Sequence, residues 1–333
     1  MAEFQQIKNL VRDYYAALDA AEPDTVENVL KNYVTGTYFW RGMHPFYEQK
    51  GAQAVAEVFW RPFLRSFKHV QRRQDIFLAG KNDGKGEGVE WVCSMGHLLG
   101  LFDEDWLGIP ANRKMNFVRY AEFHCVQDGK IRETALFIDI VGVMMQVGLK
   151  PLPPQTGAFI VTPGPMTHDG LLLGEQDPSE GQKTLDLVNR MVRELTSAEM
   201  ESPQNELLGT WRPDMLWFGP AGIGATYTTG RYQEQHQGPF SQNLSEIEFH
   251  GHVCRIAEGN YAAWFGWPNL TMRPTGGFLG LPACDRTVEM RVVDIYRREG
   301  DKLAENWIFI DLLHFLSMQG LNVLERLKHH PRT

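Results

Sequence analysis

The chain has 333 residues, a length typical of two domains, and 43% of them are hydrophobic, which is enough to bury two cores. Its formal net charge of -8 at pH 7 argues against nucleic acid and against an anionic membrane as partners. No secretory leader and no run of roughly 20 apolar residues stands in the sequence, so we expect a cytoplasmic protein. The four cysteines have no CxxC spacing and are expected to be free thiols.

Helical periodicity dominates the first part of the chain. Apolar residues at three- and four-residue steps predict an amphipathic helix over residues 4–20, and further helices are expected over 23–33 and 50–67. The strands expected after them are 89–102, 114–127 and 129–139, and a last helix follows Asp139. Helices first and antiparallel strands afterwards indicate an α+β fold, not a sheet built from βαβ units.

The sequence repeats itself. Residues 106–149 align with residues 278–321 without a gap, at an offset of 311 − 139 = 172 that pairs Asp139 with Asp311. Upstream the offset is 217 − 40 = 177, and the difference is absorbed in the Gly-rich hairpin loop at 81–88. Identical glycine, proline, lysine, glutamate and aspartate residues occupy equivalent positions in the two segments. A chance similarity between apolar stretches would not align these residue types. We therefore predict two copies of one domain.

A segment dense in proline and glycine separates the copies. We assign residues 1–150 to copy one, 151–183 to a linker and 184–333 to copy two. Two apolar pieces in the linker, AFIV and LLL, predict that it is partly held against a domain surface.

Two sequence motifs resemble those of a known protein family. MGHLLGLF…LGIPANRK, residues 95–114, resembles the strand motif of SnoaL-like polyketide cyclases, and DGKIRETALFIDIVGVMMQVGL, which starts at Asp128, resembles their closing motif. Copy two has the corresponding LGLPACDR and DKLAENWIFIDLLHFLSMQGL. The order of elements also resembles the nuclear transport factor 2-like superfamily.

This resemblance implies a fold and an activity. The fold is a tandem of cone-shaped domains, each with N-terminal helices packed on a strongly curved antiparallel, cystatin-like sheet, arranged as a pseudo-dimer. The activity is acid/base catalysis without metal or cofactor by the aspartate of the closing motif, here Asp139 and Asp311, as in an aldol cyclisation. The family histidine corresponds to His97, which Asn269 replaces in copy two. The resemblance also implies that the protein belongs to bacterial secondary metabolism.

Both aspartates stand in apolar runs, where burial raises the pKa of a carboxyl group toward the working range of a general base. Each also stands where a strand gives way to a helix. Asp139 and Asp311 can therefore simply be helix N-caps, and the two interpretations are compatible.

Five further positions are candidate substrate contacts. They are His97, Asn269, Trp40, Trp217 and His44. The histidines and the asparagine have an alternative as satisfied or surface residues, and the two tryptophans suit a filled core slightly better than a cavity wall. Arg119 and Arg291 match each other on a strand, and each suits a salt bridge between the domains as well as a substrate contact. No metal site is expected, because His250, His252 and Cys254 lack a fourth ligand.

The leading hypothesis is an enzyme that acts by acid/base chemistry on a polyketide or small carbonyl compound, as a cyclase, isomerase or related lyase. The alternatives are a binding module whose cone holds an apolar small molecule and a structural protein with filled cones. Because the copies are covalently joined, we expect an intramolecular pseudo-dimer that is a monomer or a weak homodimer in solution.

Overall fold

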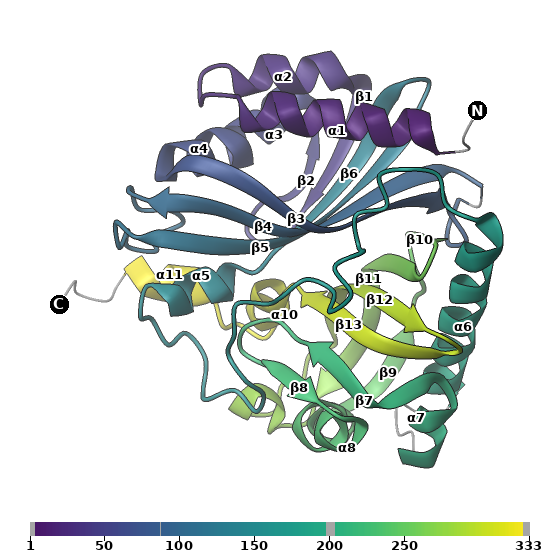
Figure 1. The fold of residues 1–333 in the computed structure, drawn as a ribbon. Helices are drawn as coiled ribbons and strands as arrows, with labels where there is room; N and C mark the ends of the chain where they lie inside the picture. Colours follow the sequence, from purple (N-terminus) through teal and green to yellow (C-terminus); the bar gives the residue numbers. More distant parts are fainter. Residues whose placement is uncertain (1–3, 87, 198–203, 329–333) are drawn as a thin grey trace.

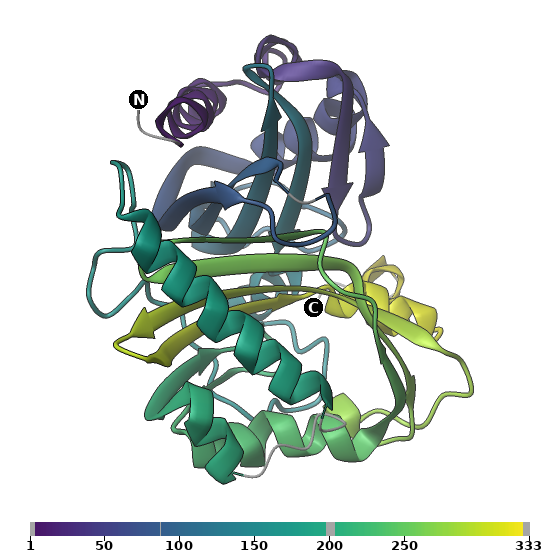
Figure 2. The ribbon, with the colours of Figure 1, turned by 90° about the vertical axis from the view of Figure 1, so that its right-hand side faces the viewer.

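The computed structural model of the chain describes residues 4–86, 88–197 and 204–328. It contains two sheets that face each other, with the N-terminal helices of each copy on the outer side of that copy's own sheet (Figure 1, Figure 2). The short helices that follow Asp139 and Asp311 lie near the boundary between the copies (Figure 1). No described helix is long and apolar enough to cross a membrane. We call the space between the sheet and the helices of one copy its cone.

Copy one begins with helices and continues into a six-stranded sheet of order β2-β1-β6-β5-β4-β3. Its elements are α1 (Gln5–Asp19), α2 (Val26–Tyr33), β1 (Val34–Gly42), β2 (Tyr47–Lys50), α3 (Ala52–Val55), the π-helical turn η1 (Ala56–Trp60), α4 (Arg61–Ser66), β3 (Phe67–Lys81), β4 (Glu90–Phe102), β5 (Met115–Gln127), β6 (Lys130–Ile138) and α5 (Ile140–Gln146). Strand β1 pairs with β6 in parallel, and the other neighbours pair in antiparallel fashion.

Copy two repeats this order of elements. Its elements are α6 (Pro178–Ser197), α7 (Gln204–Thr210), β7 (Trp211–Phe218), β8 (Ala225–Tyr227), α8 (Thr229–Tyr232), the π-helical turn η2 (Gln233–Gln237), α9 (Gly238–Asn243), β9 (Leu244–Phe249), β10 (Cys254–Glu258), β11 (Tyr261–Pro274), the 3-10 turn η3 (Phe278–Gly280), β12 (Val288–Glu299), β13 (Lys302–Ile310), α10 (Leu312–Met318) and α11 (Val323–Lys328). Its sheet has the order β10-β11-β12-β13-β7-β8, with β9 also paired to β11, and β7 pairs with β13 in parallel. The α+β class with N-terminal helices on a mainly antiparallel sheet is confirmed for both copies.

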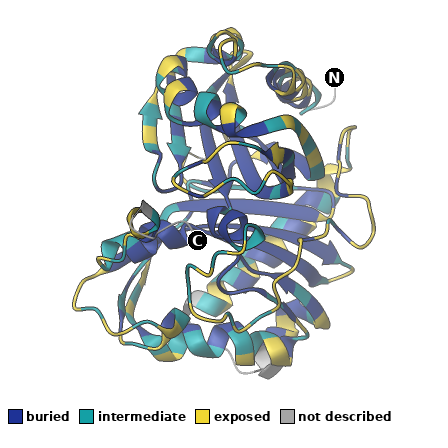
Figure 3. Cartoon of the chain, turned by 90° about the vertical axis from the view of Figure 1, so that its left-hand side faces the viewer, coloured by how far each residue is buried: buried dark blue, intermediate teal, exposed yellow. Residues whose placement is uncertain are grey.

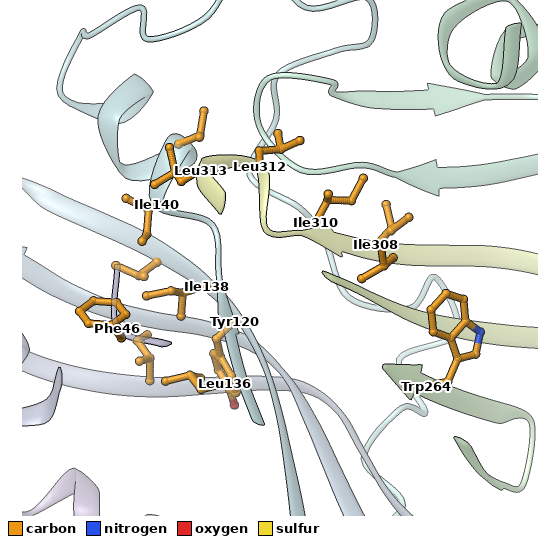
Figure 4. Packing of buried hydrophobic residues seen from close by; sticks show 14 of the residues in the cluster. Phe46, Tyr120, Leu136, Ile138, Ile140, Trp264, Ile308, Ile310, Leu312 and Leu313 are labelled. Carbon is orange, nitrogen blue, oxygen red and sulfur yellow. The ribbon is translucent and has the colours of Figure 1, made fainter. Parts of the chain in front are cut away.

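Strand residues alternate between the cone and the other copy, since successive side chains point to opposite faces of a sheet. On β6, Leu136 and Ile138 belong to the apolar cluster on the cone side, whereas Phe137 belongs to a second cluster between the sheets. Figure 4 shows Leu136 and Ile138 with Phe46 and Tyr120 in copy one, Ile308, Ile310 and Trp264 in copy two, and Ile140, Leu312 and Leu313 between them. Both faces of each sheet are therefore covered, and buried residues fill the middle of the molecule (Figure 3).

The cluster between the sheets is rich in aromatic rings. Phe265 of copy two is fully buried, with its ring centroid 5.0 Å from that of Phe123 and 5.6 Å from that of Trp91 in copy one. Three of the four cysteines, Cys93, Cys125 and Cys254, lie in this cluster as free thiols.

The segment between the copies touches both of them. The Gly170 carbonyl accepts a hydrogen bond from the Phe77 amide of copy one (2.8 Å), and the Pro163 carbonyl accepts one from the Trp307 indole of copy two (2.9 Å). Leu172 is buried, whereas Phe159 and Ile160 are exposed. Helix α6 begins at Pro178, within the range expected to be linker.

Candidate functional site

Asp139 and Asp311 each cap the helix that follows them. The Asp139 carboxylate accepts a hydrogen bond from the Gly142 amide (2.8 Å), and the Asp311 carboxylate accepts one from the His314 amide (3.2 Å). These are N-cap contacts on α5 and α10, which satisfy first-turn donors that have no partner inside the helix.

The second oxygen of each carboxylate binds the other copy. Asp139 accepts a hydrogen bond from the amide of Ala221 in copy two (2.9 Å), and Asp311 accepts one from the amide of His44 in copy one (2.9 Å). The two donors occupy equivalent positions, since 221 − 44 = 177. We call this pair of reciprocal contacts the carboxylate clamps.

The two clamps differ in burial. Asp311 is fully buried, with the Arg291 guanidinium 3.9 Å away, whereas Asp139 is half-buried. Burial raises the pKa of Asp311, and the hydrogen bond from the His44 amide opposes that rise. A cavity of about 10 Å³ lies beside Asp139, which is at the lower limit of the space that a single water molecule needs.

The matched arginines also reach across the boundary between the copies. Arg119 donates to the carbonyl oxygens of Phe218 (3.0 Å) and Gly219 (3.3 Å), and its guanidinium lies 4.2 Å from the Phe309 ring centroid. Arg291 lies 5.7 Å from the ring centroid of Tyr47 in copy one and also stacks on Trp267 of its own copy at 4.2 Å. Burial lowers the pKa of Arg119 to about 10. Arg119 thus contacts the other domain, but through hydrogen bonds to carbonyl groups and not through the expected salt bridge.

A cavity of about 120 Å³ lies in the cone of copy two. Most of its wall is aromatic or aliphatic, and the aromatic members are Trp211, Trp217, Tyr232, Phe240, Phe249, Trp264 and Tyr296. An engineered apolar cavity of about 150 Å³ binds benzene, so a compact ring or a small branched molecule has a suitable size.

Asp294 is the acidic group of this cavity. It stands on β12, is 5% exposed and accepts a hydrogen bond from the Asn306 amide nitrogen (2.7 Å). Burial raises the pKa of Asp294 to about 8, although hydrogen bonds from Asn306 and Tyr296 stabilise its charged form. The carboxyl group is therefore poised to exchange a proton near neutral pH.

Two histidines line the same cavity in their neutral form. His236 stacks on Trp217 with the ring centroids 4.1 Å apart, and His252 stacks on Trp264 at 4.0 Å. Burial lowers the pKa of each imidazole to about 3. The Nδ1 atom of His236 is buried without a hydrogen-bond partner, so it is available to a ligand.

The cone of copy one is filled. Trp40 is 1% exposed and packs on Phe59, with the centroids 5.8 Å apart. Arg72 lies deep in the same cone, where it pairs with Glu122 at 3.2 Å with both side chains almost fully buried. The interior of this cone is therefore packed around Trp40 and Arg72, and a hollow of about 540 Å³ lies at its rim between α1 and the β5–β6 hairpin. The aromatic cavity with a buried carboxyl group is a feature of copy two.

The structure separates the predicted substrate contacts. Trp217 and Asn269 line the cavity of copy two, while Trp40 belongs to the filled core. His97 lies 3.5 Å from the Asp75 carboxylate with its ring edge on Phe117, outside the cavity lining.

His44 also lies outside the cavity lining. It is 6% exposed at the clamp, and its ring contacts the Tyr47 hydroxyl at 2.7 Å. Asp139 and Asp311 do not line the cavity either, and their contacts favour the capping interpretation.

Asp294 lies outside the two family motifs, but the sequence around it indicates a buried acid. Asp294 stands in the apolar run VVDIY, the same kind of environment that singled out Asp139. It also has an acidic counterpart in copy one, Glu122, at the common offset of 294 − 122 = 172. Within the described ranges, no group of three or more His, Cys, Asp or Glu residues comes together to hold a metal ion.

We predict that the clamps contribute to stability. In Asp139→Asn or Asp311→Asn, an amide donor replaces one acceptor and faces a backbone donor, which costs about 1–3 kcal/mol of unfolding free energy. The loss is larger for Asp311, because it is fully buried and also faces Arg291. Urea unfolding measures it, with the exposed Asp301→Asn as the matched control. Unchanged midpoints for both clamp variants would contradict this role.

We also predict that Asp294 makes stability depend on pH. Because the pKa of Asp294 is about 8 in the folded protein and has its ordinary value of 3.8 in the unfolded chain, the native state retains a proton that the unfolded chain loses. Its contribution is therefore fully present below about pH 4 and is lost as the pH rises to about 8.

Asp294→Asn removes this dependence. In the folded protein His236 and His252 are neutral and Tyr232 and Tyr296 have raised pKa values, so none of them changes charge between pH 5 and 8. The titration of the two histidines in the unfolded chain is common to both proteins and cancels in the difference. Thermal unfolding of the wild type minus the variant should show a loss on the order of a few kcal/mol over that range. Equal pH slopes would show that Asp294 has an ordinary pKa.

The comparisons with known proteins agree with the sequence resemblance. The family model described as "SnoaL-like polyketide cyclase" matches residues 247–317, which lie in copy two. No curated protein matches the chain.

Three solved structures are each similar to less than half of the chain. A candidate SnoaL-like polyketide cyclase from Jannaschia sp. CCS1 is 20% identical, with 46% of this chain and 96% of that chain covered and a TM-score of 0.34. TsrD from Streptomyces laurentii is 20% identical over 41% and 96%, with a TM-score of 0.35. An NTF2-like protein from Burkholderia xenovorans LB400 is 17% identical over 42% and 97%, with a TM-score of 0.34. The family model supports the resemblance in the second copy of this tandem α+β chain, where residues 247–317 carry the SnoaL-like polyketide cyclase signature.

Proposed function

We propose that the cone of copy two is a small-molecule site in which Asp294 acts as an acid/base group on a small carbonyl compound. The observation that carries this proposal is the buried carboxyl group with a pKa of about 8 in an aromatic cavity. An acid/base group is most effective when its pKa lies near the working pH.

The chemistry needs only a proton transfer. The ionised carboxylate of Asp294 takes a proton from the carbon next to the carbonyl group. In an isomerisation the resulting acid returns that proton to another carbon of the enolate system, and in an aldol cyclisation it gives the proton to the alkoxide oxygen that forms when the enolate carbon attacks a second carbonyl group. The neutral imidazole of His236, whose Nδ1 has no protein partner, is suited to donate a hydrogen bond to the carbonyl oxygen as negative charge develops there. Isomerisation and aldol cyclisation share this first step.

Copy one has a structural role in this proposal. Its cone contains the Arg72–Glu122 pair and a packed set of rings, which leaves the sheet as a rigid partner for copy two. We keep the division into residues 1–150, 151–183 and 184–333 as part of the proposal, with the functional site confined to the third segment.

Proton exchange on a simple ketone tests the proposal without knowledge of the natural substrate. In D2O, the protein should catalyse deuterium uptake beside the carbonyl group of cyclopentanone, a compact ring, with a rate that rises through an apparent pKa near 8. Asp294→Asn should lower the rate by about 10²–10⁴-fold, the usual contribution of general acid/base catalysis. Proton NMR measures the loss of the exchanging signal.

Three controls define the outcome. Asp301→Asn should retain the wild-type rate. The clamp variants Asp139→Asn and Asp311→Asn should retain it too wherever they are folded. A rate that survives in Asp294→Asn but disappears in a folded clamp variant would move the acid/base role to the closing motif, and cyclopentanone binding without exchange would favour a non-catalytic binding module.

We also propose that the tandem chain is the covalent equivalent of a dimer and is itself a monomer. The support is that the apolar cluster between the sheets and both carboxylate clamps are formed within one chain. Light scattering on purified protein between 1 and 100 µM should give about 38 kDa, the mass of one chain. A mass that rises toward twice this value with concentration would indicate the weak homodimer instead.

A further inference from the structure

The matched acids of the two cones have different partners. In copy one, Glu122 pairs with the Arg72 guanidinium, whose side chain is 2% exposed. That guanidinium lies 3.9 Å from the ring centroid of Tyr15 and 5.0 Å from that of Tyr120. The cone of copy one thus already holds a cation, supplied by the chain, between a carboxylate and aromatic faces.

Copy two lacks this arginine. Arg72 stands opposite Leu98 on the neighbouring strand, and Phe249 stands opposite Leu270, with 270 − 98 = 172. Phe249 is therefore the counterpart of Arg72. Among the described residues Asp294 has no ion-pair partner, so its carboxyl group is buried without the cation that its counterpart has.

The surroundings of Asp294 suit a cation. Trp264 stands directly opposite Asp294 in the sheet, and Tyr296 and Tyr232 lie close enough to influence it. Aromatic faces attract organic cations, most strongly where water is excluded. The cavity of about 120 Å³ contains these rings and the carboxyl group together.

We propose that the cone of copy two binds a small organic cation, an alkylammonium or guanidinium group, in the place that the Arg72 side chain takes in copy one. The inference rests on the proposed function, because it concerns the same cavity, and it narrows the substrate class to small carbonyl compounds that carry such a group. Pairing with the cation ionises Asp294, which is the form that accepts a proton from carbon. The displaced proton leaves to solvent.

Matched pairs of probes test the charge requirement. Isothermal titration calorimetry compares guanidinium with urea and trimethylammonium with tert-butanol, because each pair has a similar shape and differs in charge. Each cation should bind at least tenfold more tightly than its neutral partner. Below pH 8 the affinity should rise with pH by up to tenfold per unit, since one proton is released on binding, and buffers of different ionisation enthalpy count that proton.

Two variants locate the site. Asp294→Asn should abolish the preference for the cation, and Phe249→Arg should block binding because the new guanidinium pairs with Asp294 as Arg72 pairs with Glu122. Phe249 is 38% exposed, so the longer side chain has room to enter. Asp301→Asn is the matched control and should bind as the wild type does. If Phe249→Arg fails to fold, the comparison of the probe pairs in the wild type and in Asp294→Asn still shows whether the cavity prefers a cation.

The outcomes separate the inference from the proposed function. Cations that bind no more tightly than urea or tert-butanol, or a preference that survives in Asp294→Asn, would overturn the inference. If either result is found while cyclopentanone still exchanges in an Asp294-dependent way, the proposed function stands and only the cation inference fails. Cation binding without any exchange would support the inference as a binding property and overturn the catalytic proposal.

Discussion

The packing of two sheets face to face is the constraint on which the other features depend. A sheet covered by helices on one face and by a second sheet on the other has no solvent side, so the buried stretches of its strands are mostly apolar. Only a few polar groups can stand between the sheets, and each needs a partner. Asp139, Asp311 and Arg119 meet this requirement by binding backbone groups of the opposite copy, which also fixes how the copies are aligned.

The two copies share one fold but differ in what fills their cones. The sheet of copy one has the same strand order as that of copy two, but its cone is closed by large rings and by the Arg72–Glu122 pair. In copy two, Phe249 replaces the arginine and Asp294 replaces the glutamate at matched positions. The loss of one buried cation leaves a carboxyl group that burial drives toward its protonated form.

Much of the fold was predictable because hydrophobic periodicity and turn-forming residues such as glycine and proline act over short stretches of sequence. The first helix, three central strands and the helix after Asp139 were predicted within a few residues of their observed bounds. Strands β1 and β3 were not, since β3 carries a charged run, KHVQRRQD, on its half-exposed part. Of the predicted substrate contacts, Trp217 and Asn269 line the cavity. The acid/base role of Asp139 and Asp311 stays a prediction, and their contacts favour capping.

The sequence by itself determined that there are two copies, which family they resemble and which acids are matched. A constant offset between similar residues is visible in the sequence without any knowledge of the three-dimensional structure. Which face of the sheet each acid occupies was decided by the tertiary structure. An apolar run surrounds Asp139 and Asp294 alike, yet the first lies between the copies and the second in a cone. In a sheet buried on both sides, hydrophobicity no longer marks the inner face, so only the assembled molecule shows where a buried carboxyl group points.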